Sequence, residues 1–319
     1  MRLTALAAFF LLSSLAAQTP PTFAINDTNT TLGTTISSFG FSAADNGRAW
    51  QITPTTTTVV QSAQFFTRNS LLTGSRFMRI EIWSDNSGLP GTRLGGGTWR
   101  IVNARPAGWQ GANLDTPVVL IANTPAWVVW REPGSSVLPL EPGGSTVLSA
   151  IASGANWTAG AQQAPKIRLF ANLLDSAHSH PFGLGCPLSS GTQPTVFTNE
   201  DPAVGNAGFF FETSGSPAGV PVILALGVDP AAVPFPLGAI GFPIGCWLNT
   251  DVILTVTLTS GTGNTKGPTC SGYDSFALAL PNNPALVGQF IAAQSLPLDL
   301  GLAAALPFAA SHAHHVVMF

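Results

Sequence analysis

Apolar and polar residues alternate with a period of two in several segments of the chain, a pattern that predicts β-strands with one buried face. In the clearest of these segments, Met78, Ile80 and Ile82 point to one face, whereas Arg79 and Glu81 point to the other. Because an unpaired charge is costly to bury, we expect the face that carries Arg79 and Glu81 to be the more hydrated one.

A turn is expected directly after this strand, at residues 85–91 (DNSGLPG), where Asn86 and Gly88 can adopt positive φ. Further along the chain, Trp127 and Trp130 are three residues apart, so in a strand they face opposite sides: one can be core while the other reaches the outer face or a rim. The same reading predicts further strands at 98–103, 117–121, 126–132, 166–172 and 220–227.

Composition supports an all-β protein that is rich in turns. Among 319 residues there are 33 Gly and 26 Pro, which together exceed the roughly 12% of an average chain. Charged residues make up 8% of the chain, the formal net charge is −3, and no basic block occurs. Nucleic acids and anionic membrane surfaces are therefore not expected as partners.

The beginning of the chain has the pattern of a secretory signal peptide. Met1 and Arg2 precede an apolar run over residues 3–15, and Ala16 and Ala17 provide a small-residue cleavage site. The run is short for a permanent membrane span, so none is expected. We therefore predict a secreted or cell-surface protein, with a signal peptide at 1–17, a first domain at 18–176 and a second at 177–319.

The first domain contains motifs that resemble a known class of extracellular domain. A strand that ends in EIWSDNSGLPG, a later TW, a W-x-G and the strand AWVVW are similar to motifs of jelly-roll-like (choice-of-anchor-type) sandwich domains of secreted bacterial proteins. The resemblance covers roughly residues 22–175. It implies a β-sandwich fold and no particular activity.

The second half resembles another module. The motifs GLGC, GNAG, the ribbon PFPLGAIGFPIGC and NPALVGQFIAAQ are similar to the two-cysteine C-terminal module of planctomycete-type secreted proteins. The expected architecture is thus two β-sandwich domains, jelly-roll-like or Ig-like. Cys186 and Cys246 correspond to the two cysteines of the module, which implies a disulfide between them. Cys270 departs from this pattern: it can displace one partner, remain free or bridge two chains, and we favour a free thiol.

Catalytic motifs are scarce. The sequence contains no G-x-S-x-G elbow, no H-E-x-x-H and no phosphate-binding glycine loop. Glu81 and Glu132 lie on predicted strands beside Arg79 and Arg131, where cross-strand ion pairs explain them better than glycoside hydrolysis. The other carboxylates considered for hydrolysis are Asp85, Asp115 and Glu141. We therefore predict no enzyme activity and no cofactor, with a glycan-active hydrolase as a remote alternative.

The histidines gather in two places. His178 and His180 are two residues apart and form a conceivable metal site, but we favour solvated linker histidines and expect no metal. The second group, at 312, 314 and 315, is expected in a last strand.

Tryptophans provide the alternative to a purely structural role. Exposed tryptophan rings stack on sugar rings, and Trp83, Trp109 and Trp157 are the candidates for such a carbohydrate site. We expect a structural or adhesion-type protein first and a carbohydrate-binding module second. Candidate partners are extracellular polysaccharide or components of the cell envelope, and the oligomeric state is left open.

Overall fold

The computed structural model describes residues 23–26, 37–40, 46–67, 76–101, 108–132, 137–140, 142–153, 156–174, 178–198, 200–229, 232–261 and 272–319. The fold is nearly all-β, with several antiparallel sheets, so the prediction of an all-β sandwich fold is confirmed. No helix in this part of the chain is long and apolar enough to cross a bilayer. The predicted signal peptide and Cys270 lie outside the described residues.

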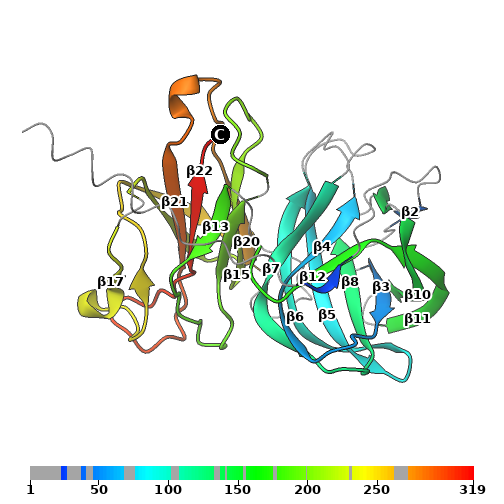
Figure 1. Cartoon of the computed structure of the whole chain (residues 1–319). Helices are drawn as coiled ribbons and strands as arrows, with labels where there is room; N and C mark the ends of the chain where they lie inside the picture. Colours follow the sequence, from blue (N-terminus) through cyan, green and yellow to red (C-terminus); the bar gives the residue numbers. More distant parts are fainter. Residues whose placement is uncertain are drawn as a thin grey trace, which may run out of the picture.

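Two six-stranded antiparallel sheets make up the N-terminal part, shown on the right of Figure 1. The first has the order β1-β12-β4-β9-β2, with β7 also paired to β4, and the second has the order β11-β10-β3-β8-β5-β6. The strands are β1 (Phe23–Asn26), β2 (Ser37–Gly40), β3 (Asn46–Ile52), β4 (Thr58–Thr67), β5 (Arg76–Asn86), β6 (Leu89–Ile101), β7 (Gly108–Leu120), β8 (Ala126–Glu132), β9 (Val137–Leu140), β10 (Pro142–Ser153), β11 (Asn156–Pro165) and β12 (Ile167–Phe170).

Aromatic rings join the two sheets across the core. Phe65 of β4 stacks on Trp130 of β8 with ring centroids 5.1 Å apart, and it meets Trp50 of β3 edge-on at 5.4 Å. All three side chains are fully buried. Ile167 and Leu169 of β12 are buried in the same cluster, as the alternation of that segment predicted. The N-terminal part is therefore a sandwich with one large apolar core.

Two glycines in β6, Gly95 and Gly97, bring the two sheets together at one edge. A Cβ atom on Gly97 would overlap the backbone carbonyl oxygen of Asn113 in β7, and one on Gly95 would lie 2.5 Å from the carbonyl oxygen of Thr116. The missing side chains thus allow β6 of the second sheet to pass directly over β7 of the first.

The β5–β6 turn was predicted only in part. Gly88 adopts positive φ (82°) as expected, but the second such residue is Ser87 (53°) and not Asn86, which ends β5. Trp127 and Trp130 do face opposite sides of β8, but neither is exposed: Trp130 joins the main core and Trp127 a smaller cluster on the outer face. One tryptophan is thus in the core and the other on the outer face, as expected, but other side chains cover Trp127 there.

The C-terminal part has its own sheets. They have the orders β13-β22-β21-β16-β19, β14-β15-β20 and β17-β18. The strands are β13 (Ser179–Phe182), β14 (Thr195–Thr198), β15 (Phe210–Ser216), β16 (Pro221–Gly227), β17 (Phe235–Pro236), β18 (Trp247–Leu248), β19 (Leu254–Thr259), β20 (Gly272–Ala277), β21 (Phe290–Pro297) and β22 (Ala313–Val317), with 3-10 helices η1 (Leu237–Ile240) and η2 (Pro284–Leu286).

The larger two of these sheets enclose a second apolar core. Phe211 from β15 and Leu224 from β16 are fully buried in one cluster with Val316 from β22. The predicted Cys186–Cys246 disulfide is present, with a Cα–Cα distance of 4.8 Å, and it lies in a separate buried cluster. The bond ties the segment after β13 to the end of the β17–β18 ribbon.

The two parts touch in the middle of the view in Figure 1, where β7 lies near β15. The backbone N–H of Gln193 donates to the carbonyl oxygen of Asp115 over 2.9 Å. Phe197 of β14 is buried in the core cluster of the N-terminal sandwich. No sheet among the described strands mixes the two parts. The boundary near residue 176 itself stays a prediction.

Candidate functional site

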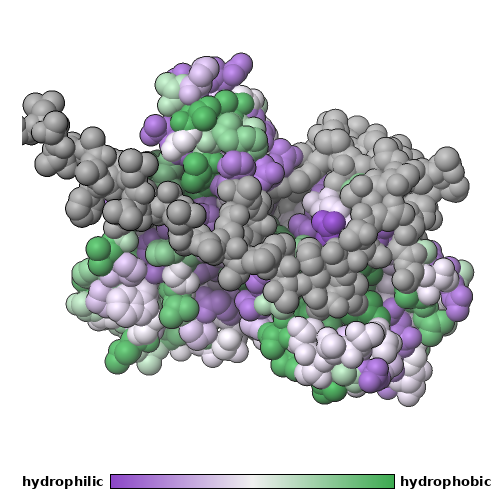
Figure 2. All heavy atoms as spheres, viewed as in Figure 1, coloured by the Kyte–Doolittle hydropathy of each residue, from purple (hydrophilic) through white to green (hydrophobic). Residues whose placement is uncertain are grey.

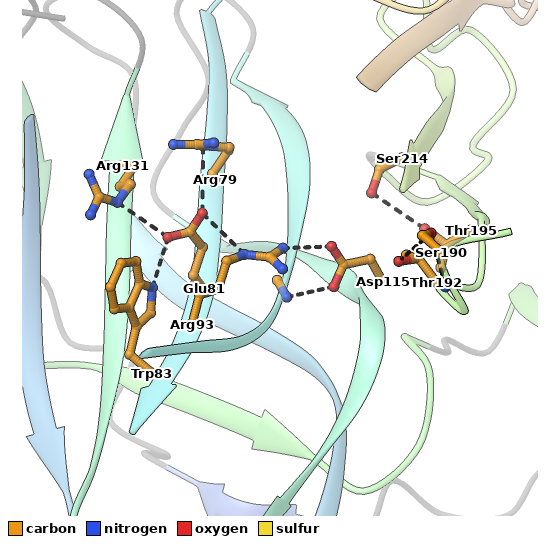
Figure 3. Close-up of polar contacts among 11 residues, drawn as sticks. Arg79, Glu81, Trp83, Arg93, Asp115, Arg131, Ser190, Thr192, Thr195 and Ser214 are labelled. Carbon is orange, nitrogen blue, oxygen red and sulfur yellow. Dashed lines mark hydrogen bonds and ion pairs between the residues drawn. The ribbon is translucent and has the colours of Figure 1, made fainter. Parts of the chain in front are cut away.

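A buried cluster of charged side chains lies on the outer face of the second sheet (Figure 3). Glu81 of β5 sits at its centre and is 2% exposed. Its Oε1 atom lies 3.5 Å from Nε of Arg93 and 3.8 Å from Nε of Arg79, and its Oε2 atom lies 3.2 Å from Nε of Arg131. The indole N–H of Trp83 donates to the same Oε2 over 2.9 Å.

Arg93 continues the cluster toward β7. Its Nη2 atom donates to Oδ2 of Asp115 over 2.5 Å, and the backbone N–H of Gly96 donates to the other carboxylate oxygen over 2.9 Å. Asp115 is 3% exposed, so it too is sealed from solvent. One arginine therefore bridges two buried carboxylates that come from different sheets.

The arginines determine the charge state of Glu81. Burial by itself would raise the pKa of the Glu81 carboxyl, but Arg79, Arg93 and Arg131 together hold that pKa below its ordinary value. The expectation that the face of Arg79 and Glu81 is the more hydrated one is wrong, since both side chains are buried. Mutual neutralisation is the physical reason: the charges are buried as partners and not singly.

Trp83 and Trp157 cover the solvent side of this cluster. Their rings meet edge to face with centroids 5.7 Å apart, and the Arg131 guanidinium lies 5.1 Å from each ring centroid. Such cation–π contacts are attractive and hold the rings in place. Both rings also pack on the small apolar cluster around Trp127.

A cleft of about 550 Å³ opens beside Trp157. One wall is the tip of the β5–β6 hairpin and the other is the start of β11. The lining residues are Ser84, Asp85, Asn86, Leu89, Pro90, Gly91, Thr92, Asn156 and Trp157. Most of them carry side-chain or backbone groups that can hydrogen-bond, and Trp157 adds one aromatic ring. This combination suits a ligand with many hydroxyl groups and flat apolar faces.

Hydrogen bonds fix the hairpin wall of the cleft. Oδ1 of Asp85 accepts from the indole N–H of Trp127 over 2.8 Å and from the amide of Gln51 over 3.0 Å, while Oδ2 accepts from the backbone N–H of Gly88 over 3.1 Å. Burial would raise the pKa of Asp85, but these three hydrogen bonds hold it below its ordinary value. The hairpin tip is thus anchored to the sheet by an ionised carboxylate.

The three tryptophans predicted as a carbohydrate site do not lie together. Trp83 and Trp157 are neighbours, but Trp83 is engaged with Glu81 and does not line the cleft. Trp109 belongs to β7 of the other sheet, where it packs edge-on against Phe66 at 5.4 Å with the Arg168 guanidinium 3.9 Å from its ring centroid. The polar residues that line the cleft with Trp157, such as Asn156, were not predicted as part of the site, because no local sequence pattern places them together.

The histidines are largely interior residues. His312 and His314 are buried, and burial lowers the pKa of His312 to about 4 and that of His314 well below its ordinary value. Nε2 of His314 lies 2.6 Å from Oγ of Ser179, and both residues are sealed from solvent. The prediction of solvated linker histidines is wrong for His180, since it lies in β13 and pairs with His315 of β22.

In the described part of the chain, no group of three or more His, Cys, Asp or Glu residues is arranged to hold a metal ion.

Comparisons with protein-family models, curated proteins and solved structures find no match to this chain. The geometry described above therefore has to carry any functional conclusion.

Proposed function

We propose that this chain is a secreted or cell-surface protein of structural or adhesion type without catalytic activity. The observation that carries the proposal is the state of the acidic residues Glu81 and Asp115. Each is almost fully buried and is held by arginine, and neither lines the cleft. Glycoside hydrolysis needs two carboxylates that reach the substrate. Among Glu81, Asp115 and Asp85 only Asp85 lines the cleft, and its oxygens accept hydrogen bonds from Gln51, Gly88 and Trp127.

An oxidising compartment is supported by the disulfide between Cys186 and Cys246, because such bonds persist mainly in exported proteins. Signal-peptide cleavage can be tested by expression with residues 1–22 in place and by N-terminal sequencing of the product. A mature chain that begins near Gln18 in the extracellular fraction would support export. A product that stays in the cytoplasm and still begins at Met1 would contradict export.

The cleft beside Trp157 favours a second function, binding of extracellular polysaccharide. The ring is held rigidly by Trp83 and Arg131, so little conformational entropy is lost when a sugar stacks on it. Asn156 and the hairpin supply hydrogen-bonding groups around the ring. An adhesion-type protein would use this cleft to hold a neutral polysaccharide.

Affinity electrophoresis against a panel of soluble polysaccharides tests this function. Retardation of the wild-type protein should be lost in Trp157→Ala and weakened in Asn156→Ala, which leaves the ring in place. Trp247→Ala is the matched control, because it removes a tryptophan that is 38% exposed and lies outside the cleft. Equal retardation of all four proteins would overturn the cleft as the binding site, and release of reducing sugars would revive the hydrolase alternative.

A further inference from the structure

An uncharged surface with large exposed apolar side chains lies at the end of the molecule where Figure 1 labels β17; in Figure 2 this end shows green apolar residues among white and pale-purple ones. It is formed by residues 232–248, called the apolar ribbon below, which contain β17, η1 and β18. No charged residue occurs between Asp229 and Asp251. Its large exposed side chains are Ile244 (99% exposed), Val233 (86%), Ile240 (54%), Phe235 (43%) and Trp247 (38%).

The apolar ribbon is a firmly held structure. Cys246 is cross-linked to Cys186, and Leu237 is buried beneath the ribbon. Leu237 donates its backbone N–H to the carbonyl of Cys246 over 2.9 Å, and Cys246 donates to that of Pro243 over 3.3 Å. The side chains that protrude from it are therefore presented on a fixed base.

The backbone of the ribbon is also suited to an environment without water. The N–H of Phe242 is bonded to the carbonyl of Leu237 over 3.3 Å. Pro234, Pro236 and Pro243 have no N–H at all. In hydrocarbon every unpaired backbone donor is costly, so this hydrogen bond and the three prolines lower the cost of bringing the ribbon to a bilayer.

The chemistry of the ribbon favours lipid over other occupants. Its only hydrogen-bonding group on an exposed side chain is the indole of Trp247, which leaves little for a polysaccharide to bind. With roughly 150–250 Å² for each fully exposed large side chain, the five present about 500–800 Å². That does not exceed the roughly 800 Å² that each partner of a stable protein interface buries.

The arrangement matches a shallow insertion into a membrane interface. Ile244 projects fully into solvent, and Trp247 lies at the base of the ribbon, paired with Pro236. Tryptophan prefers the headgroup level of a bilayer, and aliphatic side chains prefer the acyl boundary beneath it. We propose that the apolar ribbon is a lipid-binding element that inserts Ile240 and Ile244 into a membrane leaflet with Trp247 at the interface.

Because the ribbon has no cation, binding should not require anionic lipid. The full chain is sedimented with vesicles of pure phosphatidylcholine, and with vesicles that also contain phosphatidylserine. We expect a similar bound fraction on both. Ile244→Asp should lower that fraction at least about tenfold, because a charged side chain is expensive to bring into the bilayer.

Ile121→Asp is the matched control, since Ile121 is 58% exposed and lies in the N-terminal part. It should bind vesicles like the wild type, and so should Trp157→Ala, which separates this inference from the polysaccharide proposal. Absence of binding to either vesicle, or equal binding by Ile244→Asp, would overturn the inference. A dimer in sedimentation velocity that Ile244→Asp dissolves would overturn it too, in favour of a second copy of the chain.

Discussion

Replacement of Glu81 by Gln tests whether the buried charges are a matched set. The change keeps the shape of the side chain and removes one negative charge from the midst of Arg79, Arg93 and Arg131. Arg93 keeps Asp115 as a partner, whereas Arg79 and Arg131 each lose their ion pair with Glu81. Removal of one partner from a buried ion pair typically costs about 3–5 kcal/mol. Against a total of about 5–15 kcal/mol, this is a large fraction of the free energy of unfolding.

Urea unfolding followed by tryptophan fluorescence measures this loss. Seven of the eight tryptophans precede residue 176, so the signal reports mainly on the N-terminal sandwich. Gln162→Glu is the control: it makes the reverse change at an exposed position of β11 in the same sandwich, so the replacement should cost less than about 1 kcal/mol. If Glu81→Gln were no more destabilising than this control, the buried arginines would not depend on the charge of Glu81 for their stability.

Acidification provides a second measurement on the same residue. The folded-state pKa of Glu81 lies below the ordinary value of 4.5, because the three arginines outweigh burial. Its ionised form therefore contributes stability that is fully present above about pH 4.5 and is lost as the pH falls through the folded pKa. The difference in stability between wild type and Glu81→Gln should shrink in that range and stay constant between pH 5 and 7.

Three further changes probe the fold. Reduction of the Cys186–Cys246 bond, which spans 60 residues, should lower the stability of the C-terminal sandwich by about 4 kcal/mol in the chain-entropy treatment, measured by circular dichroism in urea. Gly97→Ala should lower the free energy of unfolding by about 1–3 kcal/mol, because the new Cβ would overlap a carbonyl oxygen of β7. Gly208→Ala is the control, since a Cβ there has room. Equal unfolding midpoints of the two variants would contradict this prediction. Burial lowers the pKa of His312 to about 4, below its ordinary value of 6.5. Between pH 6.5 and 4 the unfolded chain therefore binds a proton at His312 that the folded protein does not, and the free energy of unfolding falls as the pH is lowered through this range. His312→Gln should flatten the fall of Tm over that range, and an unchanged profile would refute the role of His312.

Local patterns in the sequence predicted the elements that depend on local causes. The apolar patterns of single runs identified β5, β8 and β12, because each run places apolar residues on its core face, although β5 and β8 are buried on both faces. The disulfide followed from the resemblance of the C-terminal half to a two-cysteine module. By contrast, β6 begins at Leu89, well before the predicted start at residue 98, because its glycines carry no apolar pattern. Pairing with β5 and contact with β7 determine that strand, and neither is a local property.

The candidate site was predictable only in fragments for the same reason. Arg79 and Glu81 look exposed in a single strand, and they become buried because Arg93 and Arg131 arrive from neighbouring strands. Trp157 was identified as a candidate by residue type alone. Its cleft depends on a hairpin about 70 residues earlier in the chain, and the fold alone brings the two together.

The two proposed surfaces differ in chemistry in a way that makes them separable. The cleft offers hydrogen-bonding groups around one ring, and the apolar ribbon offers almost none. We therefore expect the polysaccharide to bind only in the cleft and the lipid leaflet only at the ribbon. The two surfaces also belong to different sheets, on opposite sides of the contact between β7 and β14. If each surface binds as proposed, the wild-type chain should recruit a soluble polysaccharide to phosphatidylcholine vesicles. Trp157→Ala should then leave the protein on the vesicle without polysaccharide, and Ile244→Asp should leave it in solution with polysaccharide bound. Loss of both activities in either variant would mean that the two parts do not act independently.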